Sequence, residues 1–239
     1  MNFLVKYIGG SRIYGLETAD SDIDYRGVYI HTDPEKILRF SKENDVTASQ
    51  EKGDDYVYYE LWRYFDLLRK SNTQGVESLF IDEEDTLELN PLFLDIQESK
   101  GDLIDSEKLI SSTKGYAHNE KRLAMGERSG QLGGKRKAQV EKYGFSPKNV
   151  CQLIRISYGL EFYQEEGVFP VKLKNFLPEA FDLAFSVKTQ PNEFTKEQVE
   201  KICQEAVDRI DCVKDKQRAK FNSNTAVVFM KELYYEYLY

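Results

Sequence analysis

The sequence lacks the long apolar segments that are typical of membrane proteins. Among its 239 residues, no apolar run approaches the roughly 20 residues that a membrane-spanning helix requires. The chain also begins without the basic region, apolar stretch and small-residue cleavage site of a secretory signal. These absences predict a cytoplasmic protein with no membrane partner.

Cysteine and histidine are also scarce. The three cysteines, Cys151, Cys203 and Cys212, form an odd number without the spacing of a metal site, so we expect reduced thiols. The two histidines, His31 and His118, have no partner at metal-like spacing and are expected to be surface or packing residues. The sequence therefore offers neither a disulfide framework nor a ligand set of the zinc type.

A surplus of positive charge is missing too, because the formal net charge is −8. This balance argues against a protein that coats nucleic acid along its length. Residues 114–155 are the exception, with ten Lys and Arg against three Glu. This basic segment could bind a triphosphate tail, an RNA or a protein, or it could be a solvated helix face. A P-loop is excluded, since Gly130 and Gly134 stand too close and Arg136 replaces the Ser or Thr that binds magnesium.

What the sequence does contain is a glycine turn between two β-type segments. The apolar residues from Phe3 to Ile8 predict a strand, which ends at Gly9 and Gly10. Glycine has the greatest backbone freedom and the least bulk, so amide groups there can approach an anion closely. Ser11 follows with a hydroxyl that can bond a phosphate oxygen. The turn is therefore a candidate phosphate-binding site.

Two aspartates, Asp22 and Asp24, lie at the start of the second extended segment, which we expect to end at Ile30. Residues i and i+2 of a strand point to one face, so both carboxylates are expected on the same side. Carboxylates held so close repel each other, and a divalent cation removes the conflict. Oxygen ligands suit Mg²⁺ or Mn²⁺, and Mg²⁺ often takes one or two carboxylates together with substrate phosphates. The pattern predicts a phosphoryl- or nucleotidyl-transfer site.

The run from Gly10 to Gly27 resembles the DNA polymerase beta-like nucleotidyltransferase superfamily. That superfamily has an apolar strand, Gly-Ser, a short helical turn and Asp-x-Asp on the next strand, and the matching residues are Gly10, Ser11, Asp22 and Asp24. The extended run Gly-Ser-Arg-x-Tyr-Gly-Leu-x-Thr-x-x-Ser-Asp-x-Asp-x-Arg-Gly is similar to a bacterial and phage branch of predicted nucleotidyltransferases. The resemblance implies transfer of a nucleoside monophosphate from a nucleoside triphosphate, with release of pyrophosphate and with Mg²⁺ as cofactor.

The resemblance also implies a third carboxylate on a later strand. The candidates are Asp54, Asp55 and Glu60, which flank the β-type segment 56–59. We predict Asp55 as the third catalytic acid and metal ligand, because strand alternation gives it the same face as Val57. A solvated loop acid is the alternative. Glu60 is expected to cap the helix that follows.

Two arginines, Arg12 and Arg26, flank the acids. A planar guanidinium suits a triphosphate, so both are predicted to bind nucleotide. Arg26 could equally pair with a structural carboxylate. Thr18 and Ser21 are expected to organise the turn through side-chain to backbone hydrogen bonds.

A second block, Tyr143 to Arg155, resembles the same branch more loosely. There a Tyr-Gly-Tyr-x-x-Lys-His segment opens a helix, and Lys148 matches its lysine. Lys148 is therefore a predicted nucleotide ligand, with a solvated lysine at a helix start as the alternative. Asn149 stands where the family usually has His, so no catalytic role is assigned to that position.

The order of predicted elements indicates an α+β protein in two parts. Residues 1–100 alternate strands with short helices and predict a small mixed-sheet nucleotidyltransferase core. Residues 101–239 predict a helical domain, with helix starts at Ser146-Pro147 and at Thr195, where Gln198 completes a capping box. We predict loops over 41–54 and 128–137. A last helix from residue 222 is expected to pack on the helical domain, with a dimer contact as the alternative.

These residues predict a metal-dependent nucleotidyltransferase whose acceptor hydroxyl belongs to a small molecule, an RNA end or a protein. Two other classes stay open. A nucleotide-binding sensor would keep the site without turnover, and an Asp55 carboxylate turned away from Asp22 and Asp24 would favour it. An antitoxin-like or phage accessory protein would instead interact through the tyrosine-rich helical half.

Overall fold

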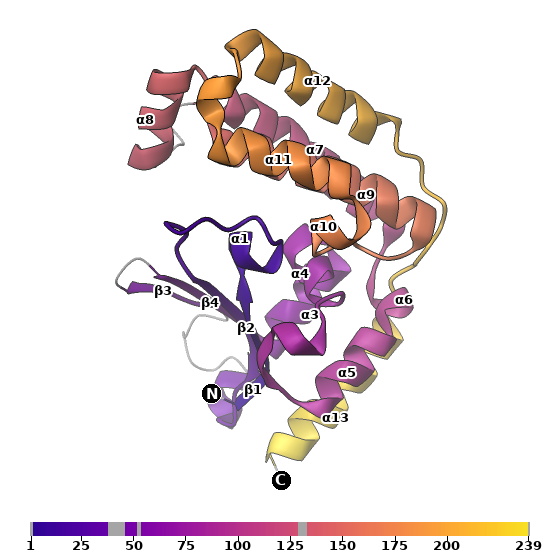
Figure 1. Ribbon diagram of the computed structural model, residues 1–239. Helices are drawn as coiled ribbons and strands as arrows, with labels where there is room; N and C mark the ends of the chain where they lie inside the picture. The colour runs from indigo at the N-terminus through magenta and orange to yellow at the C-terminus, as the bar shows by residue number, and fades with distance from the viewer. Residues whose placement is uncertain (1, 38–45, 52–53, 129–132, 239) are drawn as a thin grey trace. The chain divides into compact units, whose positions relative to one another are not determined.

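The computed structural model describes residues 2–37, 46–51, 54–128 and 133–238 (Figure 1). The chain forms two compact units, one of residues 1–109 with 217–239 and the other of residues 110–216. The first unit contains a five-stranded mixed sheet with helices, and the second is helical. The predicted α+β class with a helical region after the sheet is confirmed.

The sheet has the strand order β3-β4-β2-β1-β5. Its central strand, β2, is antiparallel to β1 and parallel to β4, and β3 and β5 add antiparallel edge strands. The start of β2 therefore lies between the end of β1 and the start of β4, and Asp24 is paired with Gly9 on one side and Asp55 on the other. The strands are β1 (Asn2–Gly9), β2 (Asp24–Ile30), β3 (Val46–Glu51), β4 (Asp54–Glu60) and β5 (Thr86–Leu89).

Strand β3 shows that the predicted loop over 41–54 was wrong over residues 46–51. Its residues pair with β4, for example Val46 with Tyr59 and Thr47 with Tyr58. The strand is largely polar and lacks apolar alternation, so only its partner strand could reveal it. Residues 41–45 and 52–53 of the predicted loop lie outside the described residues.

The helices of the first unit pack on the sheet through apolar side chains. Helix α3 contacts β2 and β4, and α5 contacts β1, which buries Leu61, Leu68 and Phe93 completely. Helix α13 contacts α3 and α6, and Phe229 stacks on Phe65 with 6.5 Å between the ring centroids. The helices of this unit are α1 (Gly10–Ile13), α2 (Pro34–Ile37), α3 (Leu61–Arg69), α4 (Thr73–Ser78), α5 (Pro91–Glu98), α6 (Lys100–Leu103) and α13 (Ser223–Leu238).

Glu60 joins three elements of the first unit. It caps α3, as predicted, because its carboxylate accepts a hydrogen bond from the Trp62 amide at 2.9 Å. The other carboxylate oxygen accepts a hydrogen bond from Tyr234 Oη of α13 at 2.8 Å. The residue is only 1% exposed. A buried carboxylate at the end of β4 therefore fixes two helices to the sheet.

The packing of α13 corrects the expectation that the C-terminal helix joins the helical part. Its partners lie in the first unit, where Tyr237 Oη also accepts a hydrogen bond from Asn90 Nδ2 at 2.6 Å. The expectation failed because these contacts join residues that are far apart in the chain. The division into functional domains 1–100 and 101–239 stays a prediction.

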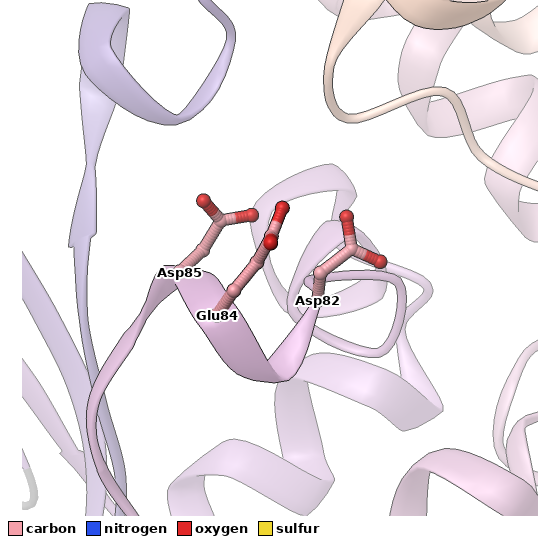
Figure 2. A group of neighbouring side chains, drawn as sticks. All are labelled: Asp82, Glu84 and Asp85. Atoms are coloured by element: carbon pink, nitrogen blue, oxygen red, sulfur yellow. The ribbon is translucent and has the colours of Figure 1, made fainter.

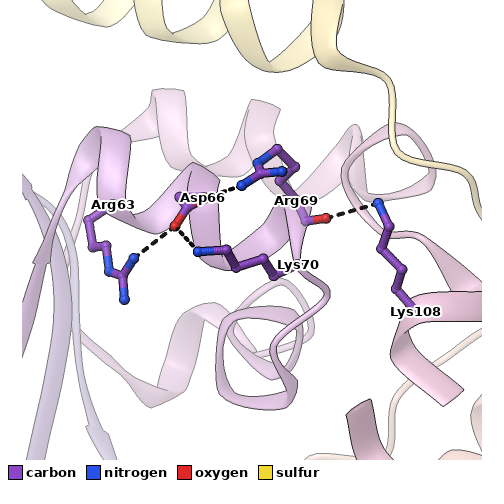
Figure 3. A network of polar contacts seen from close by, with 5 residues as sticks. All are labelled: Arg63, Asp66, Arg69, Lys70 and Lys108. Carbon is purple, nitrogen blue, oxygen red and sulfur yellow. Dashed lines mark hydrogen bonds and ion pairs between the residues drawn. The ribbon is translucent and has the colours of Figure 1, made fainter. Parts of the chain in front are cut away.

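A charged cluster stabilises the end of α3 (Figure 3). Asp66 accepts hydrogen bonds from Arg63 at 2.8 Å, from Arg69 at 2.7 Å and from Lys70 at 2.6 Å. The bond from Lys70 is the largest cause that lowers the pKa of Asp66. Lys108 adds a hydrogen bond to the Arg69 carbonyl at 3.4 Å. Cations at i+3 and i+4 from an acid, near a helix C-terminus, support the last turn.

The second unit is built around α9. Helices α11 and α12 both pack on α9, whose Leu153, Ile154 and Leu160 are completely buried. The predicted helix starts at Pro147 and after the Thr195 capping box are confirmed. The helices are α7 (Ser106–Ala124), which begins in the first unit, α8 (Gly134–Tyr143), α9 (Pro147–Glu166), α10 (Leu173–Phe176), α11 (Pro178–Thr189) and α12 (Lys196–Cys212).

Helix α8 shows that the predicted loop over 128–137 was also wrong in part. The helix begins at Gly134 and ends before Gly144, which has a φ of 81° and forms a left-handed cap. None of the α8 side chains is buried, so no apolar stripe marks the helix in the sequence. Residues 129–132 lie outside the described residues.

All three cysteines are free, as predicted. Burial raises the pKa of Cys151 to about 11 and that of Cys203 to about 12. Both thiols are therefore protonated near neutral pH and behave as core residues. In the part of the chain that the structure describes, no helix combines the length and the apolar character needed to cross a membrane.

Candidate active site at the start of β2

The turn between β1 and β2 has the close approach that a pair of glycines permits. Gly10 has a φ of +62°, a conformation that favours glycine. A Cβ on Gly10 would lie 1.8 Å from Asp24 Oδ2, and one on Gly9 would lie 2.8 Å from Arg26 Cγ. Two side chains of β2 therefore occupy the space that the glycines leave open.

Replacing Gly10 by Ala is expected to lower the free energy of unfolding by about 1–2 kcal/mol, because the left-handed backbone is strained for a residue with a Cβ. The added methyl group also displaces the Asp24 carboxylate. Gly115→Ala is the matched control, since a methyl there would meet no atom within 4 Å. That helical change should raise stability, by at most about 1 kcal/mol. Urea denaturation measures both variants, and equal shifts in the two would contradict the prediction.

Asp24 and Asp55 are neighbours in the parallel pair β2–β4, where the register places one directly opposite the other. Directly paired residues point to the same face, on strands about 4.8 Å apart. The two carboxylates therefore share one face at one end of the sheet. Asp54 instead accepts a hydrogen bond from the Ile23 amide at 3.2 Å. Of the three candidates for the third carboxylate, Asp55 is the one paired with Asp24.

Asp22 lies outside the strand, which corrects the expectation that both acids of the Asp-x-Asp pattern stand on it. Strand β2 begins at Asp24, and Asp22 is an exposed residue of the preceding connection. The Ile23 amide is bonded to the Asp54 side chain, and its carbonyl accepts a hydrogen bond from the Asp55 amide at 3.0 Å. The regular pairing of β2 with β4 therefore starts at Asp24, one residue after Ile23. The nearness of Asp22 to Asp24 depends on the single residue between them, not on strand alternation.

Arg26 joins Asp24 to β4. Its Nη2 donates to Asp24 Oδ1 at 3.0 Å, and its Nη1 donates to the carbonyls of Tyr25 at 2.9 Å and Asp55 at 3.5 Å. The ion pair is largely buried, with 20% and 18% of the two side chains exposed. Of the two roles considered for Arg26, the structure contains the pairing with a carboxylate, and that carboxylate is a predicted metal ligand.

The residues after the glycine turn leave donors for a ligand. Arg12 Nη2 donates to the Ser21 carbonyl at 3.2 Å, whereas its buried Nε has no hydrogen-bond partner among the described residues. The Ser11 hydroxyl likewise makes no hydrogen bond within the described ranges. The Thr18 amide donates to Ser21 Oγ at 2.9 Å, and the Ser21 amide to the Thr18 carbonyl at 3.0 Å, which confirms the predicted turn.

A buried glutamate that sequence reasoning missed supports the turn. Glu77 of α4 is 5% exposed and accepts a hydrogen bond from Tyr14 Oη, just after α1, at 2.6 Å. Tyr7 of β1, which pairs with Arg26, is partly buried. Burial is the largest cause that raises the pKa of Tyr7, and the charge of Glu77 raises it further. An acid inside the largely apolar segment 76–81 was the one sequence signal for Glu77.

The second block contains one exposed and one buried polar residue. Lys148 is exposed in the first turn of α9. Asn149 is 2% exposed, donates to Glu120 Oε2 at 2.8 Å and accepts a hydrogen bond from Ser146 Oγ at 2.6 Å. Burial is the main cause that raises the pKa of Glu120. Asn149 therefore links α7 to α9 within the core, and Lys148 is the ligand candidate of this block.

A separate acidic group lies at the short 3-10 helix η1 (Glu83–Asp85). Figure 2 shows Asp82, Glu84 and Asp85 with their carboxylates turned to the same side. In the described part of the chain, these form the one set of three such side chains whose ligand atoms all lie within 4.8 Å of one another. Acids at the N-terminal end of a helix interact favourably with its dipole.

The predicted set Asp22, Asp24 and Asp55 is less close, because its ligand atoms do not all lie within 4.8 Å of one another. Its chemistry still suits a divalent cation, since hard carboxylate oxygens favour Mg²⁺ and Mn²⁺. Asp24 and Asp55 share a face, and Arg26 supplies the positive charge beside Asp24. The donor set of the three aspartates therefore fits a divalent cation.

The sequence model of the RNA repair pathway DNA polymerase beta family, RlaP, matches residues 2–226. The matched range includes the glycine turn, the three aspartates and the second block. The chain belongs to this family. A comparison with curated proteins gives no match. Membership of the RlaP family confirms the resemblance to DNA polymerase beta-like nucleotidyltransferases and supports nucleotidyl transfer as the general class of activity.

Proposed function

We propose that this RlaP family member is a metal-dependent nucleotidyltransferase that moves a nucleoside monophosphate from a nucleoside triphosphate to a hydroxyl at an RNA end. The family is named for an RNA repair pathway, which favours an RNA end over a small molecule or a protein. The observation that carries the proposal is the in-register pair of Asp24 and Asp55 beside Gly10, whose missing Cβ leaves room for the Asp24 carboxylate.

In this reaction the acceptor oxygen forms a bond to the α-phosphorus, the bond from that phosphorus to pyrophosphate breaks, and the hydroxyl proton passes to a base. The requirements are mainly positioning and charge neutralisation. Gly10 and Ser11 bind the phosphates, with Arg12 as an additional donor. The three aspartates would hold the cation, and that cation would neutralise charge on the phosphates. Arg26 holds the Asp24 carboxylate in place.

A nucleotide sensor without turnover is the second candidate. The ion pair between Arg26 and Asp24 favours it, because this contact engages a carboxylate oxygen that a cation would use. A sensor would bind a nucleoside triphosphate and release it unchanged. The two candidates therefore differ in whether a labelled product forms.

The deciding experiment incubates the purified chain with single-stranded RNA and each of the four nucleoside triphosphates, labelled at the α-phosphate, in the presence of Mg²⁺. We expect labelled RNA with at least one nucleotide. Removal of the metal by EDTA should lower the rate about a hundredfold or more, since a metal supplies several kcal/mol of charge stabilisation. Mn²⁺ should restore the reaction. RNA with blocked terminal hydroxyls is the control, and nucleotide binding without labelled RNA would reject transfer in favour of the sensor.

A further inference from the structure

The ten cations of the basic segment 114–155 fall into two groups. Five of them make a hydrogen bond or an ion pair within the second unit, and these are Lys114, Lys121, Arg122, Arg128 and Arg155. The other five make neither within the described residues, and these are Lys135, Arg136, Lys137, Lys142 and Lys148. All of the second group lie on α8 or in the first turn of α9. The surplus charge of the segment is therefore concentrated on one short piece of the chain.

Helix α8 presents these charges to solvent. None of its side chains is buried, and Lys135, Lys137 and Lys142 are exposed. Lys135 and Lys142 stand seven residues apart, so they lie on one side of the helix about 10 Å apart along its axis. Glu141 is the one acid of the helix. A ten-residue helix with little packing and repelling charges is marginal by itself. A partner that supplies negative charge would stabilise it.

The start of α9 continues the same surface. Only Gly144, Phe145 and Ser146 separate the two helices. Lys148 occupies the first turn of α9, where a cation opposes the helix dipole, and no acid offsets it within the described residues. Tyr143, at the end of α8, is half-buried and has the Lys142 ammonium 4.7 Å from its ring centroid. The surface thus combines unpaired cations with an aromatic ring.

We propose that α8 and the first turn of α9 form a binding surface for the phosphate backbone of single-stranded RNA. The inference rests on the proposed function, because it assigns the residues that hold the acceptor RNA. A chain of net charge −8 attracts a polyanion only where cations are locally unpaired. The ten residues of α8 extend over about 15 Å, which suits successive phosphates of a strand better than one triphosphate.

The test measures binding of a fluorescein-labelled single-stranded RNA 15-mer by anisotropy, in EDTA and without nucleotide. Five phosphate contacts predict a slope of log affinity against log salt concentration of about −3.5 for a single strand. The variant Lys135→Gln/Arg136→Gln/Lys137→Gln should bind at least about tenfold more weakly at 0.1 M salt, with a slope about 2 units shallower. Glutamine is a good helix former, so α8 should persist, and circular dichroism checks this.

The matched control is Lys201→Gln/Lys214→Gln/Lys216→Gln, which makes the same change of net charge elsewhere in the second unit. It should bind within twofold of the wild type, and Lys135→Arg/Lys137→Arg should retain affinity. Wild-type affinity in the α8 variant, or an equal loss in the control, overturns the proposal. So does a raised KM for the triphosphate with RNA binding unchanged. A wild type that does not bind RNA also overturns the proposal and would indicate an acidic protein as the partner of this surface.

Failure of this inference can be told apart from failure of the proposed function. The binding assay contains no nucleotide or metal, so it does not depend on transfer. A wild type that binds RNA through α8 but transfers no nucleotide would reject the function and keep the surface. A wild type that transfers nucleotide while the α8 variant keeps full RNA affinity would reject only the surface.

Discussion

Replacing Asp24 by Asn should lower the rate of nucleotidyl transfer by about a thousandfold. Asn keeps the shape of the side chain but removes the negative charge that a cation requires. Metal-based stabilisation of the phosphates amounts to several kcal/mol, and each 1.4 kcal/mol changes the rate tenfold. Asp24 is the central acid of the proposed site, since it pairs with Asp55 and lies against Gly10. Single-turnover labelling of RNA measures the loss.

Asp20→Asn is the control for this experiment, because Asp20 is an exposed acid of the loop before β2. It should change the rate less than twofold. Urea denaturation of both variants checks that a loss of rate does not come from unfolding, since Asp24 also pairs with Arg26. An Asp24→Asn enzyme that keeps more than a tenth of the wild-type rate would remove Asp24 from the metal site.

The same assay separates Asp55 from Asp54. Asp55 is paired with Asp24, whereas Asp54 accepts a hydrogen bond from the Ile23 amide. If Asp55 is the third acid, Asp55→Asn should resemble Asp24→Asn, and Asp54→Asn should retain most of the rate. A large loss of rate with Asp54→Asn and a small one with Asp55→Asn would instead assign the role to Asp54.

Replacing Glu60 by Ala should lower the free energy of unfolding by about 2–3 kcal/mol, the largest loss of stability that we expect from one polar residue here. The change removes the cap of α3, which is worth about 1 kcal/mol. It also removes the carboxylate that accepts the Tyr234 hydrogen bond, in a region where Glu60 is 1% exposed, at a cost of about 1–2 kcal/mol. Urea denaturation followed by circular dichroism measures the loss.

Tyr234→Phe removes only one of the two bonds and should cost about 1 kcal/mol. The double variant with Glu60→Ala should then be less destabilised than the sum of the single variants, because both remove the same contact. Glu232→Ala is the control, since Glu232 is an exposed residue of α13. Strict additivity of Glu60→Ala and Tyr234→Phe would show that the contact contributes nothing.

The parts of the fold that sequence reasoning found are those with local causes. The strand before Gly9 and the helix starts at Pro147 and Thr195 depend on residues within a few positions of each other. The glycine turn belongs to the same class, because its backbone conformation restricts the residue type at Gly10. Asp55 was chosen as the third acid from strand alternation together with family resemblance, whereas its pairing with Asp24 is a contact that only the structure gives.

What sequence reasoning missed depends on distant partners. Strand β3 is defined by its pairing with β4 and not by its own polar residues. The position of α13 depends on Tyr234 and Glu60, which are 174 residues apart in the chain. Glu77 contacts the turn through Tyr14, 63 residues before it. A local sequence pattern cannot reveal such contacts, because the partner residue lies far outside the short stretch from which the pattern is read.

The return of α13 to the sheet has a consequence for synthesis of the chain on the ribosome. The carboxylate that ends β4 emerges early, but its tyrosine partner emerges 174 residues later. The helical unit, residues 110–216, is complete before that partner appears. The first unit therefore begins to be synthesised first but is completed last. The apolar side of α3 that packs against α13 stays uncovered during most of translation. Domains that follow one another in sequence usually fold in order, whereas here an inserted unit can mature inside an unfinished one.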